Sequence, residues 1–169
     1  MSNVASSSES SSLLVRDLQG DYRPASADEV LRAARRLLGR RVRRGCALNS
    51  PQMVRDFLRI KLAALEHEVF AVLMLDAQHR LIEYQEMFRG TVTQTSVYPR
   101  EVVKESLARN AVAVILAHCH PSGRPDPSRA DELLTRALKE ALSLVDVQVL
   151  DHFIVAGDEV LSFAETGRL

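Results

Sequence analysis

Two histidines separated by one residue, His118 and His120, directly follow an apolar segment of the chain. That segment, residues 111–117, is rich in β-branched residues and predicts a strand buried on both faces. Side chains of an extended chain alternate between the faces of a sheet, so both imidazoles are expected on the same side. Pro121 preserves this alternation, because it restricts His120 to extended backbone angles. The pattern therefore supplies two ligands for a metal ion at a strand end.

Asp131 is the candidate for a third ligand. Ser128 and Asp131 also have the spacing of a capping box, with Ser128 as the N-cap of a helix and Asp131 at its third position. The two interpretations are compatible, because a helix dipole favours the ionised carboxylate and a metal requires that form. The loop 121–127 is short and proline-rich, so it can fold the helix start back over the strand end. Two histidines and one carboxylate with an open fourth position are typical of a catalytic zinc. Water bound to such a zinc becomes acidic enough to be hydroxide near neutral pH.

The spacing of these residues resembles the signature of JAMM (MPN-type) zinc metalloproteases, His-x-His, seven residues, Ser, two residues, Asp. The closer resemblance is to the RadC-like bacterial branch, and it extends from about residue 48 to the last residue. It rests on residues 98–103 (YPREVV), 120–123 (HPSG), 127–131 (PSRAD) and 150–152 (LDH). The resemblance implies an α/β fold, a mixed β-sheet flanked by helices, with one Zn²⁺ per chain held by His118, His120 and Asp131. It also implies hydrolysis of a peptide or isopeptide bond in a peptide or protein substrate.

The same resemblance assigns two catalytic residues. JAMM proteins carry a glutamate at the start of an early strand, where it acts as general base on the zinc-bound water. Glu68 has this place before the apolar segment 69–75, with Glu66 as the alternative, because a shift of two residues keeps the same side of a strand. Glu68 as a polar residue at a helix-to-strand junction is the non-catalytic interpretation. By family likeness, Ser128 donates its hydroxyl to the oxyanion or to the zinc-bound water.

Two other residues near the motif have open roles. RadC-like proteins usually have asparagine between the two histidines, where this chain has Cys119. Alternation directs Cys119 to the opposite face of the strand, and a thiol ligand for zinc is the alternative. His152 either orients a ligating imidazole or is a buried structural histidine.

Composition limits the other classes of function. The 169 residues are 46% hydrophobic and carry no formal net charge, so no overall field attracts nucleic acid or a membrane. Two cysteines, Cys46 and Cys119, indicate a reducing compartment, and the serine-rich residues 1–12 have no signal-peptide pattern. We therefore expect a cytoplasmic protein without a membrane anchor.

A non-catalytic zinc-binding protein or a DNA-associated, repair-related accessory protein is the alternative function. The DNA-associated alternative depends on an arginine-rich segment that contains no acidic residue and could contact phosphates. The segment lacks aromatic residues for base stacking and a paired-glycine hairpin of the helix-hairpin-helix kind, so a solvated or partner-docking face is favoured over nucleic acid. Its arginines are Arg32, Arg35, Arg36, Arg40, Arg41, Arg43 and Arg44.

The sequence predicts three parts: a disordered tail (1–25), a helical arginine-rich segment (26–47) and a RadC-like domain (48–169). The expected helices begin at Ser26, at Ser50, at residue 99 and at Ser128. The expected strands are 68–76, 80–89, 91–97 as an edge candidate, 111–117, and a closing hairpin of 145–156 and 159–163.

Overall fold

The computed structural model describes residues 13–16, 19–41, 45, 47–48, 50–90 and 96–169, without the side chains of 35–41. The chain divides into two compact units, Met1–Leu37 and Leu38–Leu169. In the first unit, β1 (Leu14–Arg16) pairs antiparallel with β2 (Tyr22–Pro24), inside the segment for which we expected a disordered tail. α1 (Ala27–Arg41) begins with the capping box that the sequence predicts, because the Glu29 carboxylate accepts the Ser26 N–H at 2.9 Å.

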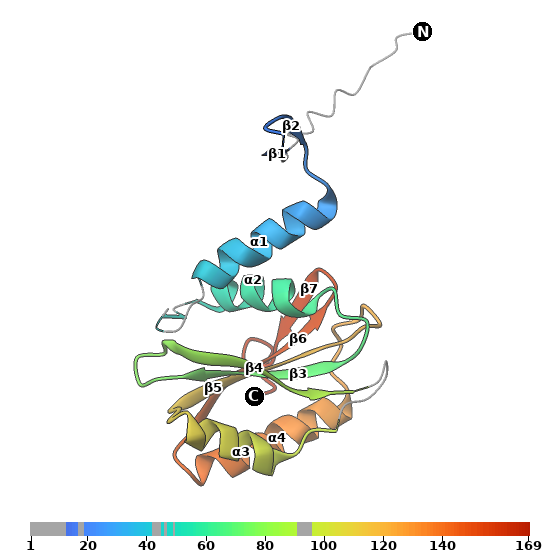
Figure 1. Cartoon of the computed structure of the whole chain (residues 1–169). Helices are drawn as coiled ribbons and strands as arrows, with labels where there is room; N and C mark the ends of the chain where they lie inside the picture. Colours follow the sequence, from blue (N-terminus) through green and yellow to red (C-terminus); the bar gives the residue numbers. More distant parts are fainter. Residues whose placement is uncertain (1–12, 17–18, 42–44, 46, 49, 91–95) are drawn as a thin grey trace. The chain divides into compact units, whose positions relative to one another are not determined.

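The second unit is built on a five-stranded mixed sheet, which confirms the predicted α/β class (Figure 1). β3, β4, β6 and β7 form its two antiparallel hairpins, and β5 lies between them, antiparallel to β3 and parallel to β6. The strand order is β4-β3-β5-β6-β7. The strands are β3 (Val69–Leu75), β4 (Leu81–Arg89), β5 (Ala113–Cys119), β6 (Gln148–Ala156) and β7 (Glu159–Ser162).

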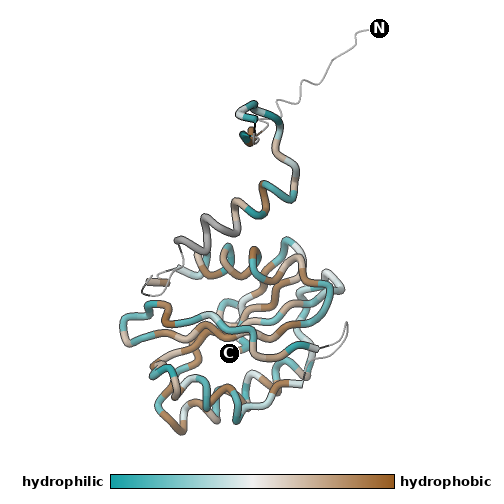
Figure 2. Tube along the Cα trace, viewed as in Figure 1, coloured by the Kyte–Doolittle hydropathy of each residue, from teal (hydrophilic) through white to brown (hydrophobic). Residues whose placement is uncertain are grey.

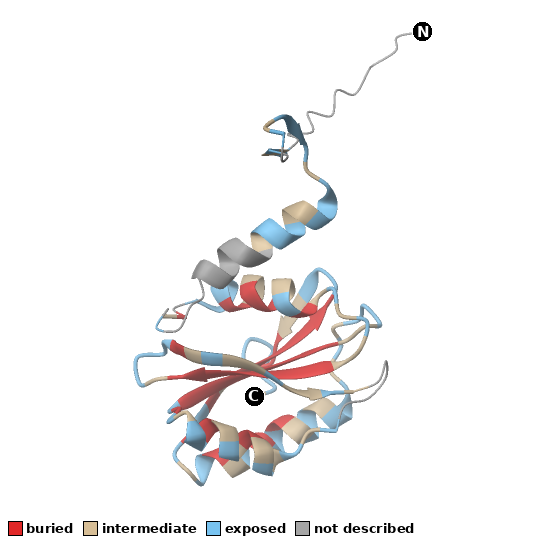
Figure 3. Cartoon of the chain, in the orientation of Figure 1, coloured by how far each residue is buried: buried red, intermediate tan, exposed pale blue. Residues whose placement is uncertain are grey.

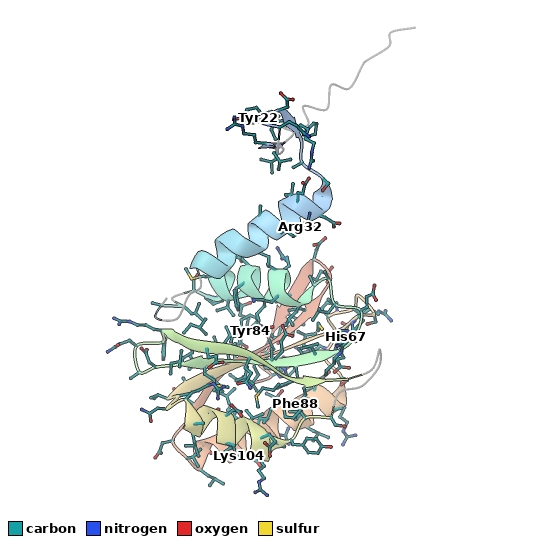
Figure 4. The ribbon with its side chains drawn as sticks, in the orientation of Figure 1. Tyr22, Arg32, His67, Tyr84, Phe88 and Lys104 are labelled. Atoms are coloured by element: carbon teal, nitrogen blue, oxygen red, sulfur yellow. The ribbon has the colours of Figure 1, made fainter. Side chains whose placement is uncertain are left out.

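Helices cover both faces of this sheet. α2 (Pro51–Leu62) lies on one face, and α3 (Pro99–Ala108) and α4 (Arg129–Ser143) lie on the other (Figure 1). The central strands β3 and β5 are buried along their whole length and are largely hydrophobic, as expected for strands packed on both faces (Figures 2 and 3). β4 is an edge strand of this sheet and is only partly buried along most of its length. Tyr84 packs against Phe57 of α2, whereas Phe88 packs against Tyr98 on the opposite side, beyond an irregularity in the β3–β4 register (Figure 4).

In the second unit, the predicted strands and helices agree with the described elements to within about three residues at their ends, except for the predicted edge strand. Residues 91–95 of the predicted edge strand 91–97 lie outside the described part, and Ser96 and Val97 are not in a strand. Two turns contain non-glycine residues in the left-handed region: Asn110 follows α3 at φ 53°, and His79 lies in the turn before β4 at φ 55°. Among the described helices, none has the length and apolar character needed to span a bilayer.

Candidate metal centre

β5 carries its side chains alternately into two cores, and this alternation aims His118. Val114 and Leu116 pack against α3 and α4, and His118 continues the same face. Ala117 and Cys119 belong to the core beneath α2. His120, just beyond the strand, remains in register because its N–H donates to the Val155 carbonyl at 2.8 Å. Both histidines therefore reach the α4 side of the sheet, as the sequence predicts.

α4 brings the carboxylate to the same place. Ser128 is its N-cap: the Asp131 N–H donates to Ser128 Oγ at 3.1 Å, and the Ser128 N–H donates to Asp131 Oδ2 at 2.8 Å. The Ser128 hydroxyl also donates to Oδ2, at 2.7 Å. The same carboxylate lies beside the two imidazoles, with Oδ1 3.3 Å from His118 Nε2. Asp131 is thus both a capping residue and a member of the histidine cluster, so the capping and metal-ligand interpretations are compatible in this geometry.

Three potential ligand atoms converge here, from His118, His120 and Asp131. The two Nε2 atoms are 2.9 Å apart, and the carboxylate oxygens lie 3.3 Å from His118 Nε2 and 3.7 Å from His120 Nε2. Four ligands about 2.0–2.1 Å from a tetrahedral zinc are roughly 3.3–3.4 Å from each other, so the spacing fits such an ion. His118 is buried, and the side chains of His120 and Asp131 are 17% and 13% exposed. The cluster therefore has the donor set, spacing and partial access of a metal site that solvent can reach.

Hydrogen bonds to the loop after β5 orient the second histidine. His120 Nδ1 lies 2.8 Å from the Arg124 carbonyl, which can only accept. Nδ1 therefore carries the hydrogen, and in the neutral ring the lone pair is on Nε2, which points into the cluster. A turn at Gly123 (φ 75°) brings the Arg124 carbonyl back to the ring. The turn is closed by the Gly123 N–H, which donates to the His120 carbonyl at 3.1 Å.

The first histidine is held from behind by a second imidazole. His118 Nδ1 lies 2.8 Å from His152 Nε2, and His152 Nδ1 lies 2.6 Å from Thr135 Oγ1. The His152 ring is fully buried between Phe70 and Phe163. Burial, followed by the nearby His118, lowers the pKa of His152 well below its usual range, so this ring is neutral. The 2.8 Å contact with His118 supports the interpretation of His152 as a residue that orients a ligating imidazole.

Thr135 is the member of this arrangement that we did not identify from the sequence. It lies one helical turn after Asp131, a spacing that places both side chains on the same face of α4. The sequence signal that could have identified Thr135 is its spacing of four residues from a candidate ligand. Polar residues four apart are common on amphipathic helices, so this signal is weak.

Charge also favours a cation at this cluster. Burial opposes ionisation of Asp131, but the interaction with the neighbouring His118 imidazole and the hydrogen bonds from Ser128 outweigh it and hold the pKa of the carboxyl well below its usual range. The carboxylate is therefore anionic at neutral pH, which is the form needed for metal binding.

The sheet register places Glu68, one residue before β3, close to this cluster. Phe70 is the cross-strand partner of His118, so the residue two positions earlier lies opposite His120, on the same face of the sheet. Glu68 is half-buried and is not a member of the ligand cluster. Glu66 lies in an exposed bend outside the strand, so the register favours Glu68 over Glu66 as a group facing the site.

Cys119 faces away from the metal centre. Its Sγ lies 3.4 Å from both the Val69 nitrogen and the His67 carbonyl oxygen, beneath α2. Burial raises the pKa of the thiol, which disfavours the thiolate that a metal would bind. The geometry therefore opposes the alternative of Cys119 as an extra ligand. Of the seven arginines in the arginine-rich segment, only Arg32 has a described side chain.

Comparison with known proteins gives one family. The RadC-like JAB domain family matches residues 48–168. A UPF0758 protein of Leptothrix cholodnii and one of Methylibium petroleiphilum are each 59% identical over 150 residues, which are 89% of this chain and 68% of theirs. A UPF0758 protein of Herminiimonas arsenicoxydans is 56% identical over 150 residues, with 89% and 67% covered.

Proposed function

Because this chain belongs to the RadC-like JAB domain family, whose wider JAB/MPN family includes metalloproteases, we propose that it is a zinc-dependent hydrolase of amide bonds. The observation that carries the proposal is the convergence of His118, His120 and Asp131 at 2.9–3.7 Å. Among the described residues the cluster contains three potential ligands. Structural zinc sites usually have four protein ligands, whereas catalytic sites have three and leave one position for water or substrate.

A bound zinc ion supplies Lewis-acid chemistry: it makes water more acidic and polarises the carbonyl of the scissile amide. Glu68 accepts the proton of the attacking water and returns it to the leaving amine. Its position opposite His120, at the start of a buried strand, supports this role. A half-buried carboxylate at such a place can exchange protons with water while the strand holds it in register.

Ser128 stabilises the developing negative charge on the amide oxygen. Its hydroxyl is 2.7 Å from the Asp131 carboxylate, so it lies beside the ligand cluster at which an amide substrate would react. The hydroxyl hydrogen can rotate from Asp131 to an oxyanion, an interaction of about 3 kcal/mol where such donors have been removed from enzymes. We propose a peptide or a protein as the substrate, cut at a peptide or isopeptide bond.

The test combines metal analysis with cleavage of an unbiased peptide library, with and without chelator. We expect about one zinc per chain and cleavage that chelator abolishes. Glu68→Gln should retain zinc and lose cleavage, whereas the matched change Glu66→Gln should retain both. Cleavage by the Glu68→Gln variant at the wild-type rate would transfer the base role to another group. A zinc-loaded wild-type chain that cuts no library member would favour the non-catalytic zinc-binding alternative.

A further inference from the structure

The hydroxyl of Thr135 has two close polar neighbours and a single hydrogen. Oγ1 lies 2.6 Å from the Asp131 carbonyl oxygen and 2.6 Å from His152 Nδ1. The carbonyl can only accept, so the hydroxyl hydrogen must go to it. The second contact is then a hydrogen bond only if His152 Nδ1 donates to Oγ1. If Nδ1 had no hydrogen, two lone pairs would face each other at 2.6 Å in a buried place.

This assignment fixes the hydrogen positions of both imidazoles behind the metal centre. The His152 ring is fully buried among Phe70, Phe163 and His118, which disfavours a charged imidazolium, and in the neutral ring a hydrogen on Nδ1 leaves a lone pair on Nε2. That lone pair faces His118 Nδ1 at 2.8 Å, so His118 must be the donor. With its hydrogen on Nδ1, the neutral His118 ring has its lone pair on Nε2, directed toward His120 and Asp131.

Without such a partner, His118 has a local reason to adopt the opposite tautomer. Asp131 Oδ1 lies 3.3 Å from His118 Nε2, and a carboxylate is a strong acceptor. A hydrogen on Nε2 would bond to Asp131 and would occupy the lone pair that a metal needs. The orientation of the ring alone therefore does not make His118 a ligand, and its tautomer must also be held.

We propose that Thr135 and His152 are positioning residues that hold His118 in the metal-binding tautomer, so that a hydroxyl two hydrogen bonds away from the ligand atom sets the metal affinity. This inference deepens the proposed function and rests on it for the identity of the metal. The hydrogen-bond chain itself is a property of the metal-free protein.

This chain of hydrogen bonds predicts that removing the Thr135 hydroxyl changes the tautomer of His118, which it does not contact directly. In Thr135→Val, which keeps the shape of the side chain, His152 Nδ1–H would face a methyl group. The buried ring then gains by moving its hydrogen to Nε2, where it points at His118 Nδ1. His118 must accept there and carry its own hydrogen on Nε2, which closes the metal site. Thr135→Ser keeps the hydroxyl and should keep the site open.

The first measurement is zinc affinity by competition with a chromophoric chelator. Loss of a group that orients a ligand typically weakens metal binding about 10- to 100-fold, and we expect this for Thr135→Val but not for Thr135→Ser. Ser106→Ala is the matched control, because Ser106 is another buried hydroxyl that donates to a carbonyl one turn earlier, at 2.8 Å, in α3. Its zinc affinity should equal that of the wild type. Equal affinities of the Thr135→Val and Thr135→Ser variants would overturn the proposal.

The second measurement reads the tautomers without metal. Nuclear magnetic resonance of the ¹⁵N-labelled imidazoles should show hydrogen on Nδ1 of His118 and His152 in the wild type, and on Nε2 of both in Thr135→Val. A wild-type spectrum with hydrogen on Nε2 of either ring would overturn the proposal. A wild-type chain that binds no zinc would refute the proposed hydrolase, and the spectrum would then decide the hydrogen-bond chain by itself.

Discussion

Asp131 has two roles that a pair of substitutions can separate. Asp131→Ala removes the carboxylate that caps α4 and, at the same time, one of three ligands. Losing a cap costs about 1 kcal/mol, against a total stability of roughly 5–15 kcal/mol for a domain. In a unit of this size, 1 kcal/mol lowers the melting temperature by about 3–5 °C. The metal-free variant should therefore remain folded.

Ser128→Ala is the matched control. It removes the other half of the same capping box, with the 2.7 Å and 3.1 Å hydrogen bonds of Ser128 Oγ, but it leaves all three ligand atoms in place. We expect the same loss of about 1 kcal/mol in the metal-free protein. The two variants should thus match in stability and differ in metal binding.

The assay is thermal unfolding with and without zinc, together with metal content after dialysis. Free zinc at 100 times its dissociation constant stabilises the folded state by about 2.7 kcal/mol, which corresponds to roughly 10 °C here. Wild type and Ser128→Ala should show this rise, and Asp131→Ala should show none and retain no stoichiometric zinc. If Asp131→Ala retains one zinc per chain, or gains as much stability from zinc as Ser128→Ala, Asp131 is not a ligand and the site is wrong.

Three further outcomes follow from the same contacts. The pKa of Asp131 is lowered in the folded state, so as the pH falls the unfolded chain binds this proton first. The metal-free wild type should therefore lose stability between about pH 5 and pH 2. In urea titrations across this range, the unfolding free energy of Asp131→Asn should depend less on pH than that of the wild type. Cys119→Ser should retain full zinc content and cost about 1 kcal/mol in urea unfolding, because the thiol lies in the core beneath α2, and zinc loss would return Cys119 to the ligand set. Asp151→Ala should cost about 3 kcal/mol, because three donors, among them the His152 N–H at 2.7 Å and the Ser162 hydroxyl at 2.6 Å, lose their buried acceptor; an unfolding free energy within about 0.5 kcal/mol of wild type would contradict this.

Local rules predicted the parts of this site that depend on local structure. Alternation along one strand gives a common face for His118 and His120, and the capping box gives the start of α4. The strands β3 to β7 follow from apolar runs separated by turn residues. The short pair β1–β2 was not predicted, because each strand has only three residues and is largely exposed, and a segment that buries so little lacks the apolar pattern of a strand.

The sequence left open whether His152 supports a ligating histidine, because the face on which it lies depends on the register between two parallel strands. β5 and β6 are joined through α4, and a helical crossover does not fix the register as a tight hairpin turn does. The register also shifts by one residue: Val114 pairs with Val149, but Ile115 pairs with Asp151, so Leu150 is an extra residue in β6. A bulge of this kind reverses the two faces of the strand beyond it.

This bulge decides which chemical group supports the metal centre. Val149 packs on the α4 side, so strict alternation would have placed Asp151 on that side and His152 beneath α2. The extra residue does the opposite: His152 lies behind His118, and the Asp151 carboxylate is bonded to Ser162 on the far side. The acceptor behind His118 is thus a neutral imidazole instead of the carboxylate that often supports a ligating histidine. A divalent ion here would have one carboxylate ligand, Asp131, without a second carboxylate behind His118. Since less negative charge near a bound cation leaves it a stronger Lewis acid, the shift at Leu150 favours the hydrolytic chemistry that we propose.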